Sequence, residues 1–318
     1  MNNRILLVGA GQLGSRYLQG LAKVARPLDI FVSDISHESL ARAEARWFEA
    51  AGTTSRHSVR FGVGISDVPR EIDLAIVATS AETREQVVSA LSEQCTVHYW
   101  VLEKVLAQSI QELDKIEASI RDGGSAWVNT PRRMIAWHKE IKAKFKQSGP
   151  FSISVVGGGW GLACNSVHFL DMLAWLSDEQ LLSISTEQLY DEWHKSKRPG
   201  FWEIYGTLTA RFSRGSVASL TCHDMDQPYL IQVCDGQDEW KIDESSGIAE
   251  RADGLVVRGK LSYQSEITTP LIESILKTGQ CELPLLKFSA ELHRPFINGL
   301  LDHWNKSTPN TISRLPIT

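Results

Sequence analysis

Glycines at positions 9, 11 and 14 form a GxGxxG pattern directly after a short apolar run. In such a turn the first glycine permits a tight bend, the second leaves room for a phosphate beside the backbone, and the third lets a helix pack closely on a strand. A phosphate would then lie at the positive end of the helix dipole. Gly9, Gly11, Gln12, Leu13 and Gly14 are therefore predicted to bind the pyrophosphate of a dinucleotide.

An acidic residue stands where ribose recognition requires one. Asp34 ends a second apolar run about 20 residues beyond the last glycine, where a carboxylate can accept hydrogen bonds from a ribose 2′-hydroxyl. Its charge would repel a 2′-phosphate, so NAD is favoured over NADP, although Arg42 or Arg46 could still assist a phosphate. The alternative is a glycine turn used only for packing, with Asp34 at a solvated strand end.

The elements that must position these residues alternate between strands and helices. The pattern predicts strands over 5–8, 29–33, 72–78 and 98–102, and helices over 13–24, 39–51 and 83–91. This alternation implies right-handed crossovers and a parallel, doubly wound Rossmann sheet. Thr79 and Ser80 follow a strand at its carboxyl end, so we expect them to cap the next helix and also to contact the cofactor.

The pattern changes near residue 149. A strand over 151–156 and a helix over 165–176 precede a series of closely spaced strands, and helices over 270–277 and 290–304 close the chain. The expected strands of this series are 204–212, 216–222, 230–234, 239–242 and 255–257. We expect an α/β protein with a Rossmann domain over 1–125 and a substrate-binding and oligomerisation α+β domain over 126–318. The second domain would contain a mainly antiparallel sheet with one open face, and the C-terminal helix could pack back on the first domain.

Composition excludes several classes of protein. A chain of 318 residues is long enough for two domains, and a formal net charge of -5 argues against a nucleic-acid partner. Five scattered cysteines without a CxxC pair offer neither a zinc site nor a disulfide framework, so we expect no metal and a reducing compartment. The chain starts without signal-peptide features, and no apolar run reaches the ~18 residues of a membrane span. A cytoplasmic protein without a membrane partner is expected.

Four segments, in this order and spacing, resemble the Gfo/Idh/MocA oxidoreductases: GAGQLG, VATSAETREQVVSAL, LEKVLAQSIQELDKI and GGGWGLACNSVHFLDML. The resemblance spans nearly the whole chain and is looser beyond Asp171. It implies hydride transfer between NAD or NADP in the Rossmann half and a CH–OH group of a sugar, inositol or related polyol. It also implies that the open face of the second sheet forms a homodimer or homotetramer.

The resemblance assigns a role to Lys104. Family members carry Glu-Lys-Pro after the fifth strand, and this chain has Glu103, Lys104 and Val105 there, so the proline does not match. The family lysine holds the reacting hydroxyl, because an ammonium can stabilise a developing alkoxide. Glu103 would support this lysine or contact the nicotinamide ribose. The alternative is a strand-end lysine in solvent.

A second family motif, Asp-x-Gly-x-His on a helix, is altered here. Cys164 replaces the aspartate and Ser166 the glycine, while His168 and the following Asp171 match. On a helix Cys164, His168 and Asp171 would share one face. The resemblance implies that His168 is the catalytic acid/base; otherwise it is a structural histidine. Without the aspartate, proton transfer falls on His168 or Lys104, or the substrate has changed, or turnover is lost.

Further side chains are predicted to contact substrate: Asn129, Arg133, Trp160, Asn165 and Asp171. Arg132 and Arg133 could bind an anionic group bidentately or simply face solvent. The aromatic residues near 190–205 form either a lid over the substrate or ordinary packing. We therefore expect an NAD(P)-dependent dehydrogenase or reductase for a sugar-like substrate, including nucleotide-activated or acidic sugars. The alternatives are a non-catalytic cofactor sensor on this fold and a reductase of a non-sugar substrate.

Overall fold

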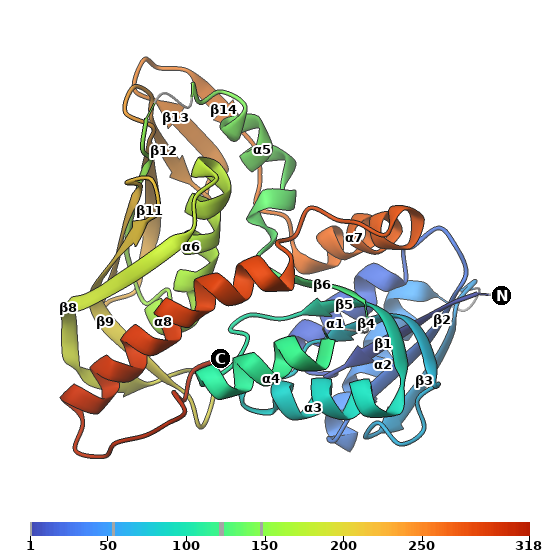
Figure 1. The fold of residues 1–318 in the computed structure, drawn as a ribbon. Helices are drawn as coiled ribbons and strands as arrows, with labels where there is room; N and C mark the ends of the chain where they lie inside the picture. The colour runs from blue at the N-terminus through green and yellow to red at the C-terminus, as the bar shows by residue number, and fades with distance from the viewer. Residues whose placement is uncertain (1, 53–54, 121–123, 147–148) are drawn as a thin grey trace. The chain divides into compact units, whose positions relative to one another are not determined.

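The computed structural model describes residues 2–52, 55–120, 124–146 and 149–318. The chain divides into two compact units (Figure 1). Unit 1 comprises Met1–Leu106, Glu112–Asn129 and Ser262–Leu286, and unit 2 comprises Ala107–Gln111, Thr130–Leu261 and Lys287–Thr318. Among the described residues, no helix combines the length and apolar character needed to cross a membrane.

Unit 1 contains a parallel six-stranded sheet in the order β3-β2-β1-β4-β5-β6. Its strands are β1 (Asn3–Val8), β2 (Leu28–Asp34), β3 (Ser58–Val63), β4 (Glu71–Val77), β5 (Thr96–Leu102) and β6 (Ser125–Val128). The fully buried Ile5 on β1 pairs with Ile30 on one side and Leu74 on the other. The strand order reverses between β1 and β4, which is the doubly wound arrangement predicted from the sequence, and such sheets bind ligands at this point.

The helices of unit 1 are α1 (Gln12–Leu21), α2 (His37–Ala51), α3 (Ala81–Gln94), α4 (Ile110–Ile120, from Glu112 on) and α7 (Gln264–Thr278). α7 packs closely on α1, because Gly20 has no side chain: a Cβ there would lie 2.4 Å from the Cβ of Thr268. Thr269 also donates a 2.9 Å hydrogen bond to the Gly20 carbonyl. The structure thus differs from the expected boundary at residue 125. Residues 262–286, which contain α7, belong to unit 1. The last helix, α8 (Leu286–Ser307), belongs to unit 2 from Lys287 on.

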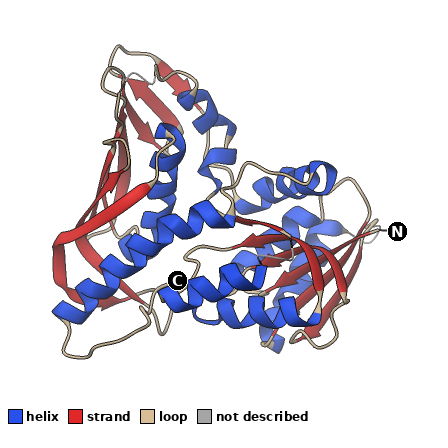
Figure 2. Cartoon of the chain, in the orientation of Figure 1, coloured by secondary structure: helices blue, strands red, loops and turns tan. Residues whose placement is uncertain are grey.

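Unit 2 contains an eight-stranded sheet in the order β14-β13-β12-β11-β7-β10-β9-β8 (Figure 2). Its strands are β7 (Ser152–Gly158), β8 (Leu181–Lys195), β9 (Trp202–Phe212), β10 (Val217–His223), β11 (Gln227–Cys234), β12 (Glu239–Asp243), β13 (Ile248–Arg251) and β14 (Val256–Arg258). Neighbouring strands are antiparallel except for the parallel pair β7–β10. The predicted mainly antiparallel sheet is confirmed, and with it the fold class.

One face of this sheet carries the core of unit 2. α6 (Leu162–Ser177) packs on β7, β9 and β10, and the short helices η1 (Pro131–Met134) and α5 (Ala136–Lys142) contribute further contacts. Residues that alternate inward along the strands, such as Val155 and Leu220, are fully buried. Outward-facing Val156, Val217 and Leu230 are about four-tenths exposed (43%, 44% and 39%), so the opposite face is open and partly apolar.

Candidate functional site

The three glycines of the first turn are needed for different physical reasons. Gly9 has a φ of +97°, and a Cβ at Gly14 would lie 1.8 Å from the Gly9 carbonyl oxygen, so packing alone demands both glycines. Gly11 has an ordinary φ of −64°, and a Cβ there would meet nothing within 4 Å. The space beside Gly11 therefore remains open for a group that approaches the backbone, as a pyrophosphate does.

The N-terminus of α1 is suited to an anion. Gly11 is its N-cap residue, and no side-chain capping hydrogen bond is formed there in the described structure. The first N–H groups of α1 thus point outward from a positive helix end. Gln12 and Leu13 form the first turn, and Gln12 accepts a 3.1 Å hydrogen bond from Arg46. These features fit the phosphates of a dinucleotide.

Asp34 lies directly beside this turn. Its Oδ2 accepts a 2.6 Å hydrogen bond from the backbone N–H of Ala10, and its Oδ1 accepts one of 2.8 Å from Ser36. Asp34 therefore builds the turn as well as offering a carboxylate at the carboxyl end of β2. Arg42 pairs with Glu38, four residues earlier on the exposed surface of α2.

The turn between β4 and α3 carries Thr79 and Ser80. Ser80 is the N-cap residue of α3, but its side chain makes no capping hydrogen bond, so the predicted capping by this side chain is wrong. The Thr79 hydroxyl is buried and finds no hydrogen-bond partner within the described ranges. A buried hydroxyl normally has a partner, and a bound cofactor would fit that requirement.

Glu103 and Asn129 were predicted to contact cofactor and substrate, and the structure joins them. The buried Glu103 carboxylate accepts a 2.5 Å hydrogen bond from the Tyr17 hydroxyl and a 2.7 Å bond from the Asn129 amide. Asn129 also donates to Gln264 of α7. Burial and the Glu103 carboxylate raise the pKa of Tyr17. The sequence analysis missed Tyr17, although its place three residues after Gly14 indicated a buried face of α1.

Lys104 is half-buried, while its neighbours Val101–Glu103 and Val105–Ser109 are all buried. The peptide bond between Lys104 and Val105, at the position of the family proline, is cis. Arg84 of α3, a second residue that the sequence analysis missed, is completely buried and donates hydrogen bonds to the carbonyls of Thr79, Val105 and Leu106.

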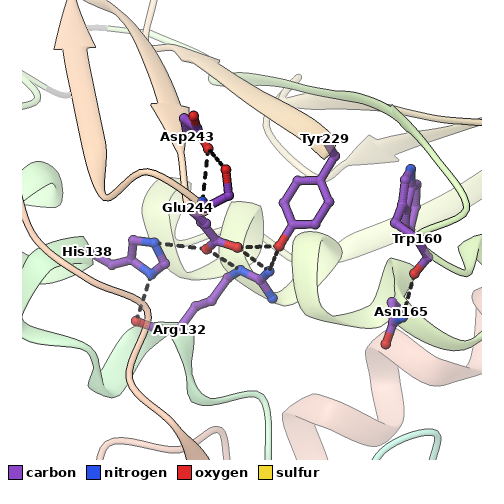
Figure 3. A network of polar contacts seen from close by, with 8 residues as sticks. Arg132, His138, Trp160, Asn165, Tyr229, Asp243 and Glu244 are labelled. Carbon is purple, nitrogen blue, oxygen red and sulfur yellow. Dashed lines mark hydrogen bonds and ion pairs between the residues drawn. The ribbon is translucent and has the colours of Figure 1, made fainter. Parts of the chain in front are cut away.

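In unit 2, the first turns of α6 present Cys164, Asn165 and His168 as a half-buried stripe among buried neighbours. The Cys164 thiol lies 3.7 Å from the Gly161 carbonyl, and Asn165 donates a 2.7 Å hydrogen bond to the Trp160 carbonyl (Figure 3). The predicted shared face therefore holds for Cys164 and His168, whereas Asp171, one turn further on, is buried.

The two arginines of η1 each bind a carboxylate of unit 2. Arg133 pairs with Asp171 through contacts of 2.6 and 3.1 Å, and Arg132 pairs with Glu244 through contacts of 2.7 and 2.9 Å. Burial raises the pKa of Asp171, and Arg133 opposes this shift. Both guanidinium forks are therefore occupied, so an anionic substrate group would have to compete with a bidentate carboxylate.

A buried polar network surrounds Glu244 (Figure 3). Besides Arg132, its carboxylate contacts the Tyr229 hydroxyl at 2.6 Å and Nε2 of His138 at 3.0 Å. Burial works against ionisation, but Arg132 and His138 hold the pKa of Glu244 well below its ordinary value. Burial and the Glu244 carboxylate raise the pKa of Tyr229.

The same network fixes Trp160. The Arg132 guanidinium lies 4.4 Å from the ring centroid of Phe169, which contacts Trp160 edge-on at 5.4 Å. Trp160 also contacts Tyr229 at 6.5 Å and donates a 2.9 Å hydrogen bond from its indole to the Thr221 carbonyl. Trp160 is thus a pre-positioned aromatic surface next to the half-buried stripe of α6.

Of the aromatic residues near 190–205, Tyr190 and Trp193 lie on β8, and Trp202 and Tyr205 lie on β9, rather than in a lid. Trp193 is buried and packs on Trp304 with ring centroids 4.9 Å apart, and Tyr205 packs on His194 at 4.8 Å. The structure supports the packing alternative.

The glycine turn, the acid beside it and the parallel sheet define a Rossmann domain of the dinucleotide-binding type. Residues 3–129 match the profile of the GFO_IDH_MocA family, described as an oxidoreductase family with an NAD-binding Rossmann fold. This segment therefore matches the Rossmann domain of the Gfo/Idh/MocA oxidoreductases, which confirms the resemblance seen in the sequence over residues 3–129.

Solved structures share the fold over nearly the whole chain. Levoglucosan dehydrogenase in complex with NADH and L-sorbose is 14% identical with a TM-score of 0.72, and the match covers 97% of this chain and 98% of that one. Scyllo-inositol dehydrogenase from Lactobacillus casei, with NAD(H) and scyllo-inositol, is 14% identical (TM-score 0.69; 96% and 98% covered). UDP-N-acetylglucosamine 3-dehydrogenase from Acidithiobacillus ferrooxidans is 13% identical (TM-score 0.69; 94% and 96% covered). No curated protein matches the chain by sequence.

Proposed function

We propose that the protein is an NAD-dependent dehydrogenase that acts on a CH–OH group of a sugar-like substrate, or reduces the corresponding ketone. The observation that carries the proposal is Lys104: it is the half-exposed residue within a buried segment, at the carboxyl end of β5 in an NAD-binding sheet. Ligands of open α/β sheets bind at this edge. A lysine at this edge can stabilise an oxygen that gains negative charge.

Bound NAD supplies the acceptor for the hydride that leaves the carbinol carbon. The Lys104 ammonium would hold the hydroxyl oxygen and stabilise it as the O–H bond breaks. The proton would pass to His168 while Lys104 stays an ammonium, or to a neutral Lys104 amine that becomes the ammonium as it takes the proton. The hydrogen bonds of Glu103 to Tyr17 and Asn129 favour a supporting role for this carboxylate over direct contact with a ribose.

Substrate contacts on unit 2 would come from the half-buried stripe of α6 and from Trp160. Asn165 offers an amide to substrate hydroxyls, and the indole of Trp160 offers a surface for sugar C–H groups. Asp171 and Arg133 form an ion pair with each other. We therefore propose that they contact the substrate as a pair without net charge, and not as two separate charged groups. Asn129 donates its amide to the Glu103 carboxylate, so we propose that Asn129 supports Glu103 and does not contact the substrate directly.

The direct test follows the absorbance of reduced nicotinamide with NAD and a panel of probes. Levoglucosan, scyllo-inositol, myo-inositol and UDP-N-acetylglucosamine are suitable, because the structural neighbours are named for or bound to such compounds. Turnover of at least one probe that depends on Lys104 supports the proposal. Turnover that persists unchanged in Lys104→Ala would show that the lysine has no part in the reaction.

A second candidate is a cofactor-binding protein that does not catalyse the reaction. The observation in its favour is Cys164, a weak donor that contacts the Gly161 carbonyl where the family has an ionised aspartate. The substitution Cys164→Asp distinguishes the two. Rising turnover with unchanged NAD affinity indicates an enzyme limited by the missing carboxylate, whereas NAD binding without turnover in either protein indicates a sensor.

We also propose that a second copy of the chain covers the open face of the eight-stranded sheet. Val156 of β7 is paired with Leu230 of β11, and Val217 of β10 projects from the same open face four residues further along, so this face carries partly exposed apolar side chains. A homodimer or homotetramer would bury it. Light scattering after gel filtration should show an oligomer that Leu230→Glu converts to a smaller species; a monomeric wild-type protein would exclude this interface.

A further inference from the structure

Arg84 is the unusual residue of unit 1. It lies on α3 and is completely buried, at 0% exposure, although arginine is almost never fully buried unless it is paired. Burial of a guanidinium carries a large desolvation penalty, so its hydrogen bonds are needed to hold it there. An apolar side chain would fill the same space at lower cost.

Its donors reach two different turns of the sheet edge. Nη2 donates to the carbonyl of Thr79, which follows β4. Nη1 donates to the carbonyls of Val105 and Leu106, which follow β5, and its distance to the Leu106 oxygen is 3.2 Å. A planar guanidinium has several donors in a fixed fork, which lets one side chain bind carbonyls of both turns at once. Arg84 thus sets the distance between the Thr79 turn and the segment that follows Lys104.

The residue on the other side of Lys104 is also fixed. The Glu103 carboxylate is bound by Tyr17 of α1 and by Asn129 after β6. Burial raises the pKa of the Tyr17 hydroxyl, Glu103 adds to this shift, and the positive charge of Arg84 acts on the same hydroxyl in the opposite direction. A buried anion and a buried cation therefore hold the chain immediately before and immediately after Lys104.

We propose that Arg84 is the positioning residue of Lys104. Its guanidinium, together with Tyr17 acting through Glu103, fixes the backbone on both sides of the lysine relative to the Thr79 turn and the glycine turn. The lysine ammonium is thereby held in one place beside the predicted cofactor site. This inference rests on the proposed function, in which Lys104 contacts the reacting oxygen; Arg84 acts through the main-chain oxygens of Thr79, Val105 and Leu106.

The kinetic test compares Arg84→Gln with Arg70→Gln, an exposed arginine of the same unit, as the matched control. With the probe from the panel that the wild-type protein oxidises fastest, Arg84→Gln should lower kcat by roughly 10- to 100-fold, because small misplacements of a reacting group cost about this much. The KM for NAD should stay within about threefold, since the glycine turn and Asp34 are unaltered.

A double variant separates positioning from general damage. If Arg84 acts through Lys104, adding Arg84→Gln to Lys104→Ala should lower kcat no further, because the group that is positioned is already gone. Multiplying losses would indicate a merely structural role and overturn the inference. Full activity of Lys104→Ala would instead refute the proposed function.

Hydrogen exchange provides a readout that does not need turnover. Arg84→Gln should speed amide exchange over residues 103–107 and 79–81, while exchange in β2 stays unchanged. Tyr17→Phe removes a single hydroxyl, serves as the milder variant if Arg84→Gln fails to fold, and should speed exchange near residue 103. Unchanged exchange over 103–107 in the folded variants would overturn the inference, even if none of the probes is turned over.

Discussion

The Asp34 carboxylate and the backbone N–H of Ala10 form a 2.6 Å hydrogen bond that ties the end of β2 to the glycine turn. The residue predicted to recognise the ribose therefore also shapes the loop that would bind the pyrophosphate. A charged acceptor shortens and strengthens such a bond. A substitution of Asp34 can therefore change both the geometry of the glycine turn and the affinity for the nucleotide.

Asp34→Ala should weaken NAD binding by roughly 10- to 100-fold, the usual effect of losing a hydrogen bond to a charged group. Calorimetric titration with NAD and NADP measures it. Asp34→Asn is the matched variant, because it keeps an acceptor for Ala10 and should fold normally while losing the charge. If NAD affinity is unchanged in Asp34→Ala, the assignment to the ribose is wrong.

Two glycine substitutions should separate binding from stability. Gly11→Ala places its methyl group in open space, so the free energy of unfolding should change little, while NAD affinity should fall by roughly tenfold or more as the methyl blocks the close approach of phosphate. Gly14→Ala forces a methyl group to within 1.8 Å of the Gly9 oxygen and should cost about 1–3 kcal/mol of stability.

Denaturant unfolding and calorimetry, applied to both variants, check this pair of outcomes. Gly11→Ala protein that binds NAD as tightly as the wild type would show that nothing approaches the backbone at this position, and the packing-only interpretation of the turn would then hold.

Lys104→Ala should lower turnover by ~100-fold or more while NAD still binds, the scale expected for loss of a positioned charge stabiliser. Steady-state kinetics and NAD titration measure the two quantities. Lys115→Ala, an exposed lysine of α4, is the control and should behave as the wild type. Equal losses in both variants would point to a nonspecific effect of charge.

The network around Glu244 predicts the pH dependence of stability. Because Arg132 and His138 depress the pKa of Glu244 in the folded protein below its ordinary 4.5, the stabilisation is fully present above that value. It is lost as the pH falls through the lower pKa of the folded state. Glu244→Gln should reduce the free energy of unfolding at neutral pH by about 3–5 kcal/mol, as expected when one partner of a buried pair is removed.

Urea unfolding between neutral and acidic pH measures this effect, and the Glu244→Gln profile should be flatter than the wild type on the acidic side. Glu239→Gln, an exposed carboxylate on β12, provides the control. If the free energy of unfolding of Glu244→Gln falls with decreasing pH as steeply as that of the wild type, other carboxylates govern the stability in acid.

Some elements were poorly predictable because their local patterns are weak. β8 runs beside β9 with three register irregularities, so the alternation of inward and outward residues is interrupted, and its aromatic residues suggested a loop as readily as a strand. β3 lies at the edge of the sheet beside β2 and is largely exposed, which leaves no apolar run to detect. A pattern-based prediction depends on burial, and edge strands have little of it.

The glycine turn, the acid at the end of β2 and the alternation of strands and helices could all be predicted from the sequence, because they depend on backbone dihedrals and on the periodicity of burial over short stretches. Folding in three dimensions was needed to bring the buried polar partners together: Arg133 with Asp171, Arg132 with Glu244, and Tyr17 with Glu103. These partners lie 38, 112 and 86 residues apart. Such pairs form because a buried charge must find a partner, and packing rather than local sequence brings that partner into reach.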